Sequence, residues 1–151
     1  MFSLSRVTSE HPDFRAMVQL LDRELAILDG DDHAFYAKLN TIDKIQHAIV
    51  AYQGEQPVGC GAIRAFDGHS TEVKRMYVLP AHRNPGIAGK VLAELETWAQ
   101  ELGFSRCVLE TGKRQHDAIW LYQKSGYRLI PNYGQYAGVD NSVCMEKNIG
   151  L

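Results

Sequence analysis

Hydrophobic residues recur at two different spacings along the chain, and these spacings predict the order of its elements. Alternation over residues 2–8 predicts a short strand. Apolar residues at helical spacing after Pro12 predict a helix that ends near residue 29, and a second short helix is expected over residues 33–39. The amino-terminal part is therefore predicted as a strand followed by two helices.

The middle of the chain has the pattern of an antiparallel meander. Alternating and small apolar residues predict strands over 48–52, 57–66 and 71–79. Turn residues separate them at Gly54-Glu55 and again at 67–70. We therefore expect three consecutive strands to pair side by side.

After the meander, helices and strands alternate. The predicted elements are a helix over 86–102, a strand over 105–111, a helix over 117–124, and closing strands over 127–130 and 143–147. One face of the first of these helices carries Ile87, Val91, Leu95, Trp98 and Leu102. Together the elements predict a single mixed α/β (α+β) domain over residues 1–151.

Composition and charge narrow the class of partner. The chain has 151 residues, a mass of 17.0 kDa, 45% hydrophobic residues and 23% charged residues, as is typical of a soluble globular protein. A net charge of −2 and a pI near 6.3 give no electrostatic reason to expect nucleic acid or a membrane as partner. The basic pairs Lys74-Arg75 and Lys113-Arg114 are interpreted as solvated faces or local phosphate contacts.

Cysteine and histidine give no sign of a metal site. Cys60, Cys107 and Cys144 each lie inside an apolar run, there is no C-x-x-C, and the histidines lack metal-ligand spacing. We interpret the thiols as small buried residues in a reducing cytoplasm, and we expect no metal. No signal peptide and no apolar stretch of bilayer length is apparent, so a cytoplasmic location is expected.

The stretch Arg83–Lys90 has the composition of an anion site. It joins a predicted strand to a predicted helix, where free backbone N–H groups point out of the helix end. Asn84 can cap the helix and Pro85 can occupy its first position. The remaining candidates are the amides of Gly86, Ile87, Ala88 and Gly89 and the charges of Arg83 and Lys90. Phosphate is the expected ligand.

Three motifs in order resemble the GNAT superfamily of N-acetyltransferases. The stretch Arg83-x-x-Gly86-x-Ala88 resembles the phosphate loop of that family, and Glu72–Pro80 resembles the strand before it. Residues Ala118–Tyr127 resemble the family's Ala…Leu-Tyr…Gly-Phe signature. The chain departs from the family at Asn84, where glycine is usual, and at the proline that follows.

The resemblance implies a fold, a co-substrate and a reaction. The expected fold is the GNAT-like acyl-CoA N-acyltransferase fold, a mixed, mostly antiparallel sheet with a splayed central strand pair flanked by helices. The expected reaction is direct transfer of the acetyl group from acetyl-CoA to an amine. Met76, Tyr77 and Val78 would contact the pantetheine arm through their backbone, although their alternation also fits core packing. Gln115 stands near the place of a family asparagine, and homodimers are common in the family.

The same resemblance assigns two catalytic candidates. Tyr122 matches the family tyrosine that protonates the departing thiolate, and its alternative role is packing on an amphipathic helix. Glu72 matches a glutamate that some branches use as general base through water, and its alternative is a surface charge at a strand end. The oxyanion donor is expected to be a backbone N–H near Met76 or Tyr77.

The acceptor is expected to be the amine of a small molecule. Acidic residues that would attract a cationic amine are Asp29, Asp31, Asp32 and Glu110, although acidic loop residues are usually solvated. Tyr133 and Tyr136 would offer apolar faces with polar tips, in a loop over 131–142 that would cover the site. One alternative is a non-catalytic acyl-CoA-binding module. A nucleotide-binding domain is disfavoured because the loop lacks the Gly-Lys-Ser/Thr ending of a P-loop.

Overall fold

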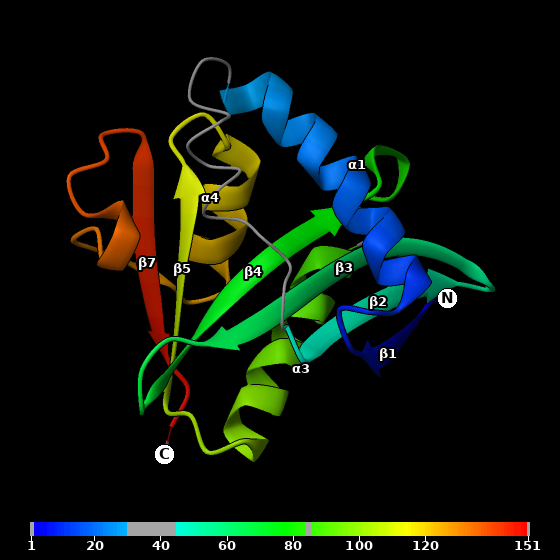
Figure 1. Cartoon of the computed structure of the whole chain (residues 1–151), viewed down its shortest axis with the longest axis horizontal. Helices are drawn as coiled ribbons and strands as arrows, with labels where there is room; N and C mark the ends of the chain where they lie inside the picture. Colours follow the sequence, from blue (N-terminus) through cyan, green and yellow to red (C-terminus); the bar gives the residue numbers. More distant parts are fainter. Residues whose placement is uncertain (1, 30–44, 84–85, 151) are drawn as a thin grey trace.

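The computed structural model describes residues 2–29, 45–83 and 86–150. Its centre is a seven-stranded sheet in the order β1-β2-β3-β4-β5-β7-β6 (Figure 1). The strands are β1 (Ser3–Val7), β2 (His47–Gln53), β3 (Gln56–Ala65), β4 (Ser70–Val78), β5 (Arg106–Gly112), β6 (Arg128–Ile130) and β7 (Ser142–Asn148). Of the described pairs only β4 and β5 run parallel, which confirms the mixed, mostly antiparallel sheet.

Helices cover both faces of the sheet. The helices are α1 (Pro12–Asp29), α3 (Ile87–Glu101) and α4 (His116–Lys124), with short 3-10 turns η2 (Pro80–His82) and η3 (Gly134–Tyr136). In Figure 1, α1 crosses the near face while α3 lies behind the sheet. These bounds confirm most of the predicted elements to within a few residues. The second helix predicted over 33–39 lies outside the described residues.

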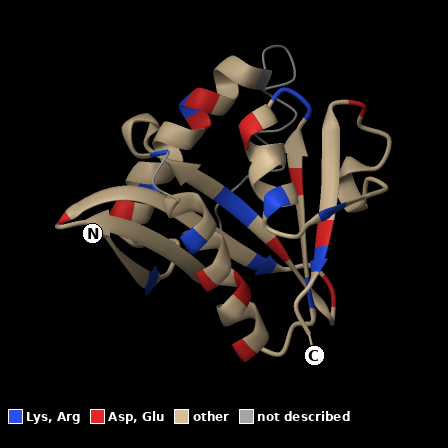
Figure 2. Cartoon of the chain, turned by 180° about the vertical axis from the view of Figure 1, so that it is seen from behind, with Lys and Arg blue, Asp and Glu red and all other residues tan. Residues whose placement is uncertain are grey.

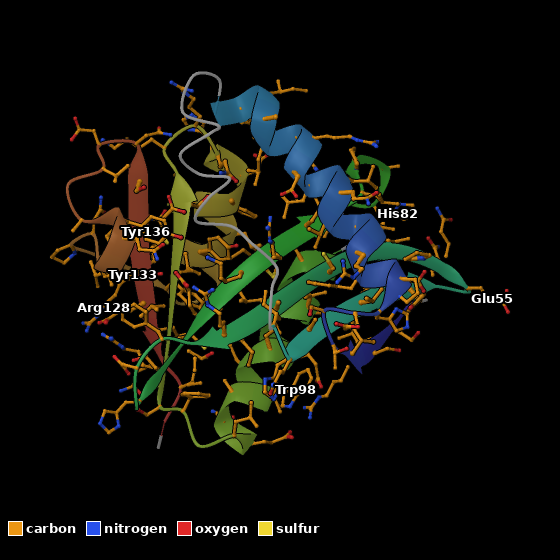
Figure 3. The ribbon with its side chains drawn as sticks, viewed as in Figure 1. Glu55, His82, Trp98, Arg128, Tyr133 and Tyr136 are labelled. Carbon is orange, nitrogen blue, oxygen red and sulfur yellow. The ribbon has the colours of Figure 1, made fainter. Side chains whose placement is uncertain are left out.

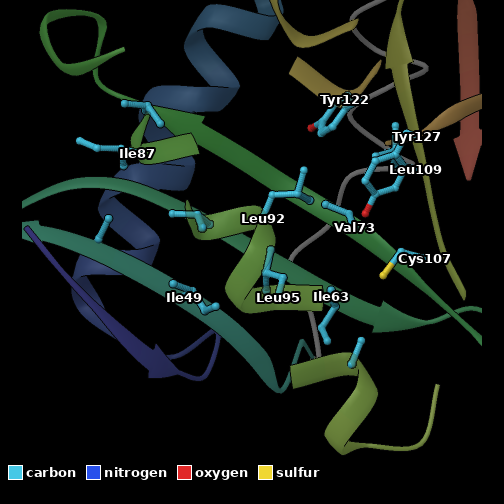
Figure 4. Close-up of a cluster of buried hydrophobic side chains, with 14 of the residues drawn as sticks. Ile49, Ile63, Val73, Ile87, Leu92, Leu95, Cys107, Leu109, Tyr122 and Tyr127 are labelled. Atoms are coloured by element: carbon cyan, nitrogen blue, oxygen red, sulfur yellow. The ribbon is translucent and has the colours of Figure 1, made fainter. Parts of the chain in front are cut away.

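Each face of the sheet has its own hydrophobic core. On one face, Phe14 and Val18 of α1 pack on Val50 and Ala62. On the other face, Val91, Leu92, Leu95 and Ala99 of α3 pack on the strands (Figure 4). Leu102, predicted on the same face of this helix, is its C-cap residue, lies one position beyond the end of α3 and is 43% exposed. The buried residues of α3 include Leu92 and Ala99 in addition to the predicted Ile87, Val91 and Leu95.

The central parallel pair separates after three paired positions. β4 pairs with β5 only at Ser70, Thr71 and Glu72, and Glu72 lies opposite Val108. Beyond that point β4 continues to Val78 while β5 runs on to Gly112, and Figure 1 shows the two strands diverging. The predicted splayed strand pair is thereby confirmed. The edge of β4 that faces β5 is unpaired with it from residue 73 onward.

A bulge bends β4 in the same region. Lys74 lies opposite Ala62, and Tyr77 lies opposite Cys60, so two residues of β4 stand against the single residue Gly61. Arg75 within the bulge has φ 61°, in the left-handed region. A side chain at Gly61 would begin 2.5 Å from Met76 Sδ, so the close approach of the strands requires glycine there.

Two features of the described residues bear on partners. No helix among residues 2–29, 45–83 and 86–150 is long and apolar enough to cross a membrane. Nor does that part of the chain hold a group of three or more His, Cys, Asp or Glu side chains able to bind a metal. All three cysteines are free and buried, which confirms that prediction.

Candidate active site

A groove runs beside the end of β4, between α1, the start of α3 and α4. The groove is lined in part by six of the residues predicted from the sequence to bind the co-substrate. These are Met76, Tyr77, Val78, Arg83, Ala88 and Gln115. They come from β4, from the turn after it, from the first turn of α3 and from the residue before α4. The groove therefore brings together elements that are distant in sequence.

The amino terminus of α3 offers backbone donors near one end of this groove. Its N-cap is Gly86, with φ 84°, which has no side chain that could cap the helix. The first hydrogen bond in the helix is from Lys90 N to Gly86 O at 3.2 Å, so the amides of residues 87–89 have no acceptor in the helix. The predicted cap residues Asn84 and Pro85 lie outside the described residues.

The side chains around this helix end have other contacts. The Ile87 side chain is buried in the core, so only its backbone can serve the groove. Lys90 Nζ lies 5.1 Å from the centre of the Phe2 ring. Arg83 donates from Nε to Val78 O at 2.9 Å and from Nη2 to Glu24 Oε2 at 2.7 Å. Arg83 thus ties the turn to β4 and α1, and its contact with phosphate stays a prediction.

A second cavity, here termed the chamber, adjoins the groove. Its polar lining includes Glu72, Lys74, Arg75, Glu110 and Tyr136. The residues that line both the chamber and the groove are Leu21, Leu25, Met76, Gln115 and Tyr122. The two cavities therefore meet beside Tyr122.

Glu72 lies buried in the wall of the chamber. It is 5% exposed, so the alternative of a surface charge at a strand end is wrong. Tyr133 donates its hydroxyl to Glu72 Oε2 at 2.6 Å, while Lys74 Nζ and Arg64 Nη2 lie 3.5 Å and 3.8 Å from Oε1. Glu72 is buried because it occupies the last paired position of β4 before the strands separate.

Two tyrosines from the connection between β6 and β7 lie at the chamber: Tyr136 lines it, and Tyr133 contacts Glu72 in its wall. Tyr136 is buried and lines the chamber, and its ring meets the Tyr133 ring edge to face at 5.6 Å (Figure 3). Burial and the negative charge of Glu72 raise the pKa of both phenols. Both hydroxyls are therefore neutral donors at ordinary pH. Among the predicted acceptor residues, Glu110 also lines the chamber, whereas Asp31 and Asp32 lie outside the described residues.

Tyr122 stands where groove and chamber meet. It projects from α4, is buried, and packs edge to face with the Tyr127 ring at 5.9 Å (Figure 4). Burial, and next the charge of Glu110, raise the pKa of Tyr122, so it keeps its proton at neutral pH. The two roles considered for Tyr122, core packing and proton donation, are therefore compatible with each other.

The sequence did not identify the basic pair Lys74-Arg75 as part of the site. The prediction of a solvated face is wrong for these two residues, because they are 7% and 8% exposed and line the chamber. In Figure 2 the basic segment of β4 lies within the sheet. Lys74 Nζ donates to the Tyr136 hydroxyl at 3.4 Å, and Arg75 Nη1 to Asp22 Oδ1 at 2.7 Å. The only local signal was their place between the apolar residues Val73 and Met76.

Comparisons with known proteins agree with this geometry. The model of the acetyltransferase (GNAT) family matches residues 14–127. The chain is 36% identical over 146 residues to an IAA acetyltransferase of Azospirillum brasilense, covering 93% of this chain and 95% of that protein. Its fold is similar to a crystal structure described as an acyl-CoA N-acyltransferase of Klebsiella pneumoniae, with TM-score 0.84, 30% identity and coverage of 99% and 98%.

A more distant solved structure shares the fold alone. An N-acetyltransferase of Thermoplasma acidophilum in complex with coenzyme A has a TM-score of 0.73 to this chain at 15% identity. The similarity covers 98% of this chain and 99% of the other chain. The arrangement of elements therefore extends over the whole described chain and is kept at low sequence identity.

Proposed function

This chain belongs to the acetyltransferase (GNAT) family, and from that premise we propose that it moves the acetyl group of acetyl-CoA directly to the primary amine of a small molecule. Dependence on acetyl-CoA follows from the family, whereas the acceptor and the direct route are the proposal. The observation that carries it is the meeting of the groove and the chamber beside Tyr122.

The groove fits the chemical groups of acetyl-CoA. The amides of residues 87–89, which have no acceptor within the helix, suit the pyrophosphate, because Gly86 has no side chain to compete for them. The unpaired edge of β4 from residue 73 to 78 offers backbone groups to the amides of the pantetheine arm. The amide of Gln115 lies at the point where groove and chamber join. The thioester would then lie near Tyr122.

The reaction needs an attacking amine and a leaving thiolate. The amine nitrogen forms a C–N bond to the thioester carbon, the C–S bond breaks, and coenzyme A leaves with its sulfur. Tyr122, which keeps its proton at neutral pH, donates to that sulfur. Glu72 takes the amine proton through water, since the acceptor ammonium must lose a proton to attack.

The buried thiols favour direct transfer over a covalent acetyl-cysteine. Burial raises the pKa of Cys60 and of Cys107 to about 12, and burial also raises the pKa of Cys144. Thiolates are the nucleophilic form, so all three are poor acetyl carriers. An amine in the chamber can instead reach the thioester where the two cavities meet.

The chamber favours a small acceptor over a peptide. Tyr133 and Tyr136 pack against each other and, through Glu72 and Lys74, against β4. This contact fixes the connection between β6 and β7 beside the chamber wall, and we propose that it keeps an extended chain out. A free amine of small size fits a pocket of this lining better than a backbone segment does.

Initial-velocity kinetics with a panel of small amines and a lysine peptide test the proposal. Direct transfer predicts intersecting double-reciprocal lines, an acetylated small amine, and no labelled protein after acid quench with radiolabelled acetyl-CoA. Parallel lines with labelled protein would contradict the direct route. Tight acetyl-CoA binding without transfer to any amine would instead identify a non-catalytic acyl-CoA-binding module.

A further inference from the structure

The bulge in β4 places two consecutive basic side chains on one face of the sheet. Successive strand residues normally point to opposite faces. Lys74 lies opposite Ala62, which belongs to the core beneath α1, so its side chain is on that face. Arg75 reaches Asp22 of α1, so it points the same way. Without the extra residue at the bulge, only one of the two cations would lie on this face. With it, both do.

Both cations are held out of water at the chamber wall. Lys74 faces Glu72 and Tyr136, and burial together with the neighbouring positive charges of Arg64 and Arg75 lowers its pKa despite Glu72. Two buried cations this close repel each other and cost desolvation free energy. Glu72 and Asp22 offset part of this cost, and a further anion bound in the chamber would offset more of it.

Arg75 has an unused donor beside this pair. Asp22 accepts from Nη1, while Nε is buried and has no hydrogen-bond partner among residues 2–29, 45–83 and 86–150. Nε and Nη2 form the edge of a guanidinium that gives paired hydrogen bonds to a carboxylate. The side chain of Arg75 is 5% exposed, so solvent is a poor substitute for that partner.

We propose that the acceptor amine also carries a carboxylate, which binds Lys74 and Arg75 in the chamber while the amine faces the thioester beside Tyr122. The acceptor class is thus an amino acid or a related amino carboxylate. This inference rests on the proposed function. A singly charged carboxylate is favoured over phosphate because Glu72 and Glu110 line the same chamber and repel a doubly charged group.

Matched acceptors test the inference on the wild-type enzyme. Each amino acid is compared with its carboxamide and with the amine that lacks the carboxyl group, at a pH corrected for the pKa of each amine. We expect kcat/KM to be at least about 10-fold higher for the carboxylates, mainly through KM. Equal or faster transfer to the neutral analogues overturns the inference and leaves the proposed function standing. Transfer to no amine overturns both.

A variant pair adds a second readout. Lys74→Gln should raise KM for the amino carboxylate about 10-fold or more and bring the ratio between carboxylate and carboxamide toward one. Lys113→Gln, at an exposed lysine that does not line the chamber, should leave that ratio unchanged. An unchanged ratio in folded Lys74→Gln overturns the role of Lys74. The wild-type comparison stands even where a substitution at this buried position prevents folding.

Discussion

The hydroxyl of Tyr133 lies 2.6 Å from Oε2 of Glu72, although the two residues are 61 positions apart in the sequence. The contact joins the connection between β6 and β7 to the last position at which β4 pairs with β5. The candidate general base is thereby held by the same segment that contributes Tyr136 to the lining of the chamber. Acceptor binding and base position are expected to depend on each other.

Removing this hydroxyl should affect both stability and activity. Tyr133→Phe leaves a buried carboxylate short of one donor, so we expect a loss of about 1.5–3 kcal/mol in unfolding free energy and a lower kcat. Denaturant unfolding and steady-state kinetics check this. Tyr52→Phe is the matched control, because Tyr52 donates to Asp13 Oδ2 at 2.6 Å away from the chamber. A similar fall in kcat in both variants would contradict a specific role for Tyr133.

Tyr122→Phe should lower kcat and leave acetyl-CoA binding intact. Loss of a positioned proton donor costs roughly 10²–10⁴-fold in rate, while the ring that packs in the core is kept. The control is Tyr127→Phe, since the Tyr127 hydroxyl donates to Glu96 rather than lining the groove. Turnover and the acetyl-CoA dissociation constant are measured for both variants. A Tyr122→Phe enzyme with unchanged kcat would remove the acid role.

Gly89→Ala should raise stability while weakening acetyl-CoA binding. Gly89 is in the first turn of α3, and a Cβ there meets nothing within 4 Å, so alanine gains up to about 1 kcal/mol in helix propensity. The same methyl group would hinder a phosphate that approaches the helix amides. Gly68→Ala, also free of contacts, should not change the dissociation constant. Unchanged binding in Gly89→Ala would contradict the pyrophosphate assignment.

Gly61→Ala should destabilise the protein. The added Cβ would lie 2.5 Å from Met76 Sδ and 2.9 Å from side-chain atoms of Leu95 and Val91. Overpacking of this kind costs typically about 1–3 kcal/mol. Thermal unfolding measures the loss, again against Gly68→Ala. A melting temperature equal to that of the wild type would show that the strands at the bulge can separate.

Alkaline pH should unfold the protein through its buried phenols. The pKa values of Tyr122, Tyr127, Tyr133 and Tyr136 are raised above their ordinary value of 10.0, chiefly by burial. Above pH 10 the unfolded chain releases these protons first, so stability present below pH 10 falls by up to about 1.4 kcal/mol per pH unit for each phenol. The lowered pKa of Lys74 has the opposite effect on the pH dependence of stability, but Lys74 is one group against four phenols.

Melting temperatures between pH 9 and 11.5 provide the measurement. The wild type should lose stability steeply above pH 10, and Tyr133→Phe should lose it less steeply because one raised phenol is gone. Equal slopes would show that Tyr133 titrates in the folded protein as it does in the unfolded chain.

The sequence was sufficient for features that depend on local pattern. The helix face around Val91 and Leu95, the hairpin at Gly54 and the glycine-containing start of α3 all follow from spacing and turn residues. The separation of β4 from β5 was expected only through the family resemblance, because no residue pattern marks where a pair of parallel strands stops pairing.

The sequence could not show which charged residues are buried. Lys74 and Arg75 look solvated in a linear pattern, and only the bulge opposite Gly61 turns both toward the chamber. Likewise, the contact between Tyr133 and Glu72 depends on how a distant connection folds back. These long-range arrangements decide the acceptor site. The co-substrate groove is also assembled from distant elements, but its motifs in β4, at the start of α3 and in α4 are each readable locally in the sequence.

Thermal unfolding in the presence of acetyl-CoA tests most directly whether the groove holds the donor. A ligand at 100 times its dissociation constant adds about 2.7 kcal/mol to the stability of the native state. We therefore predict that the melting temperature of the wild type rises by several degrees with acetyl-CoA and with coenzyme A, and much less with ATP. No rise at millimolar acetyl-CoA, or an equal rise with ATP, would contradict the assignment of the groove.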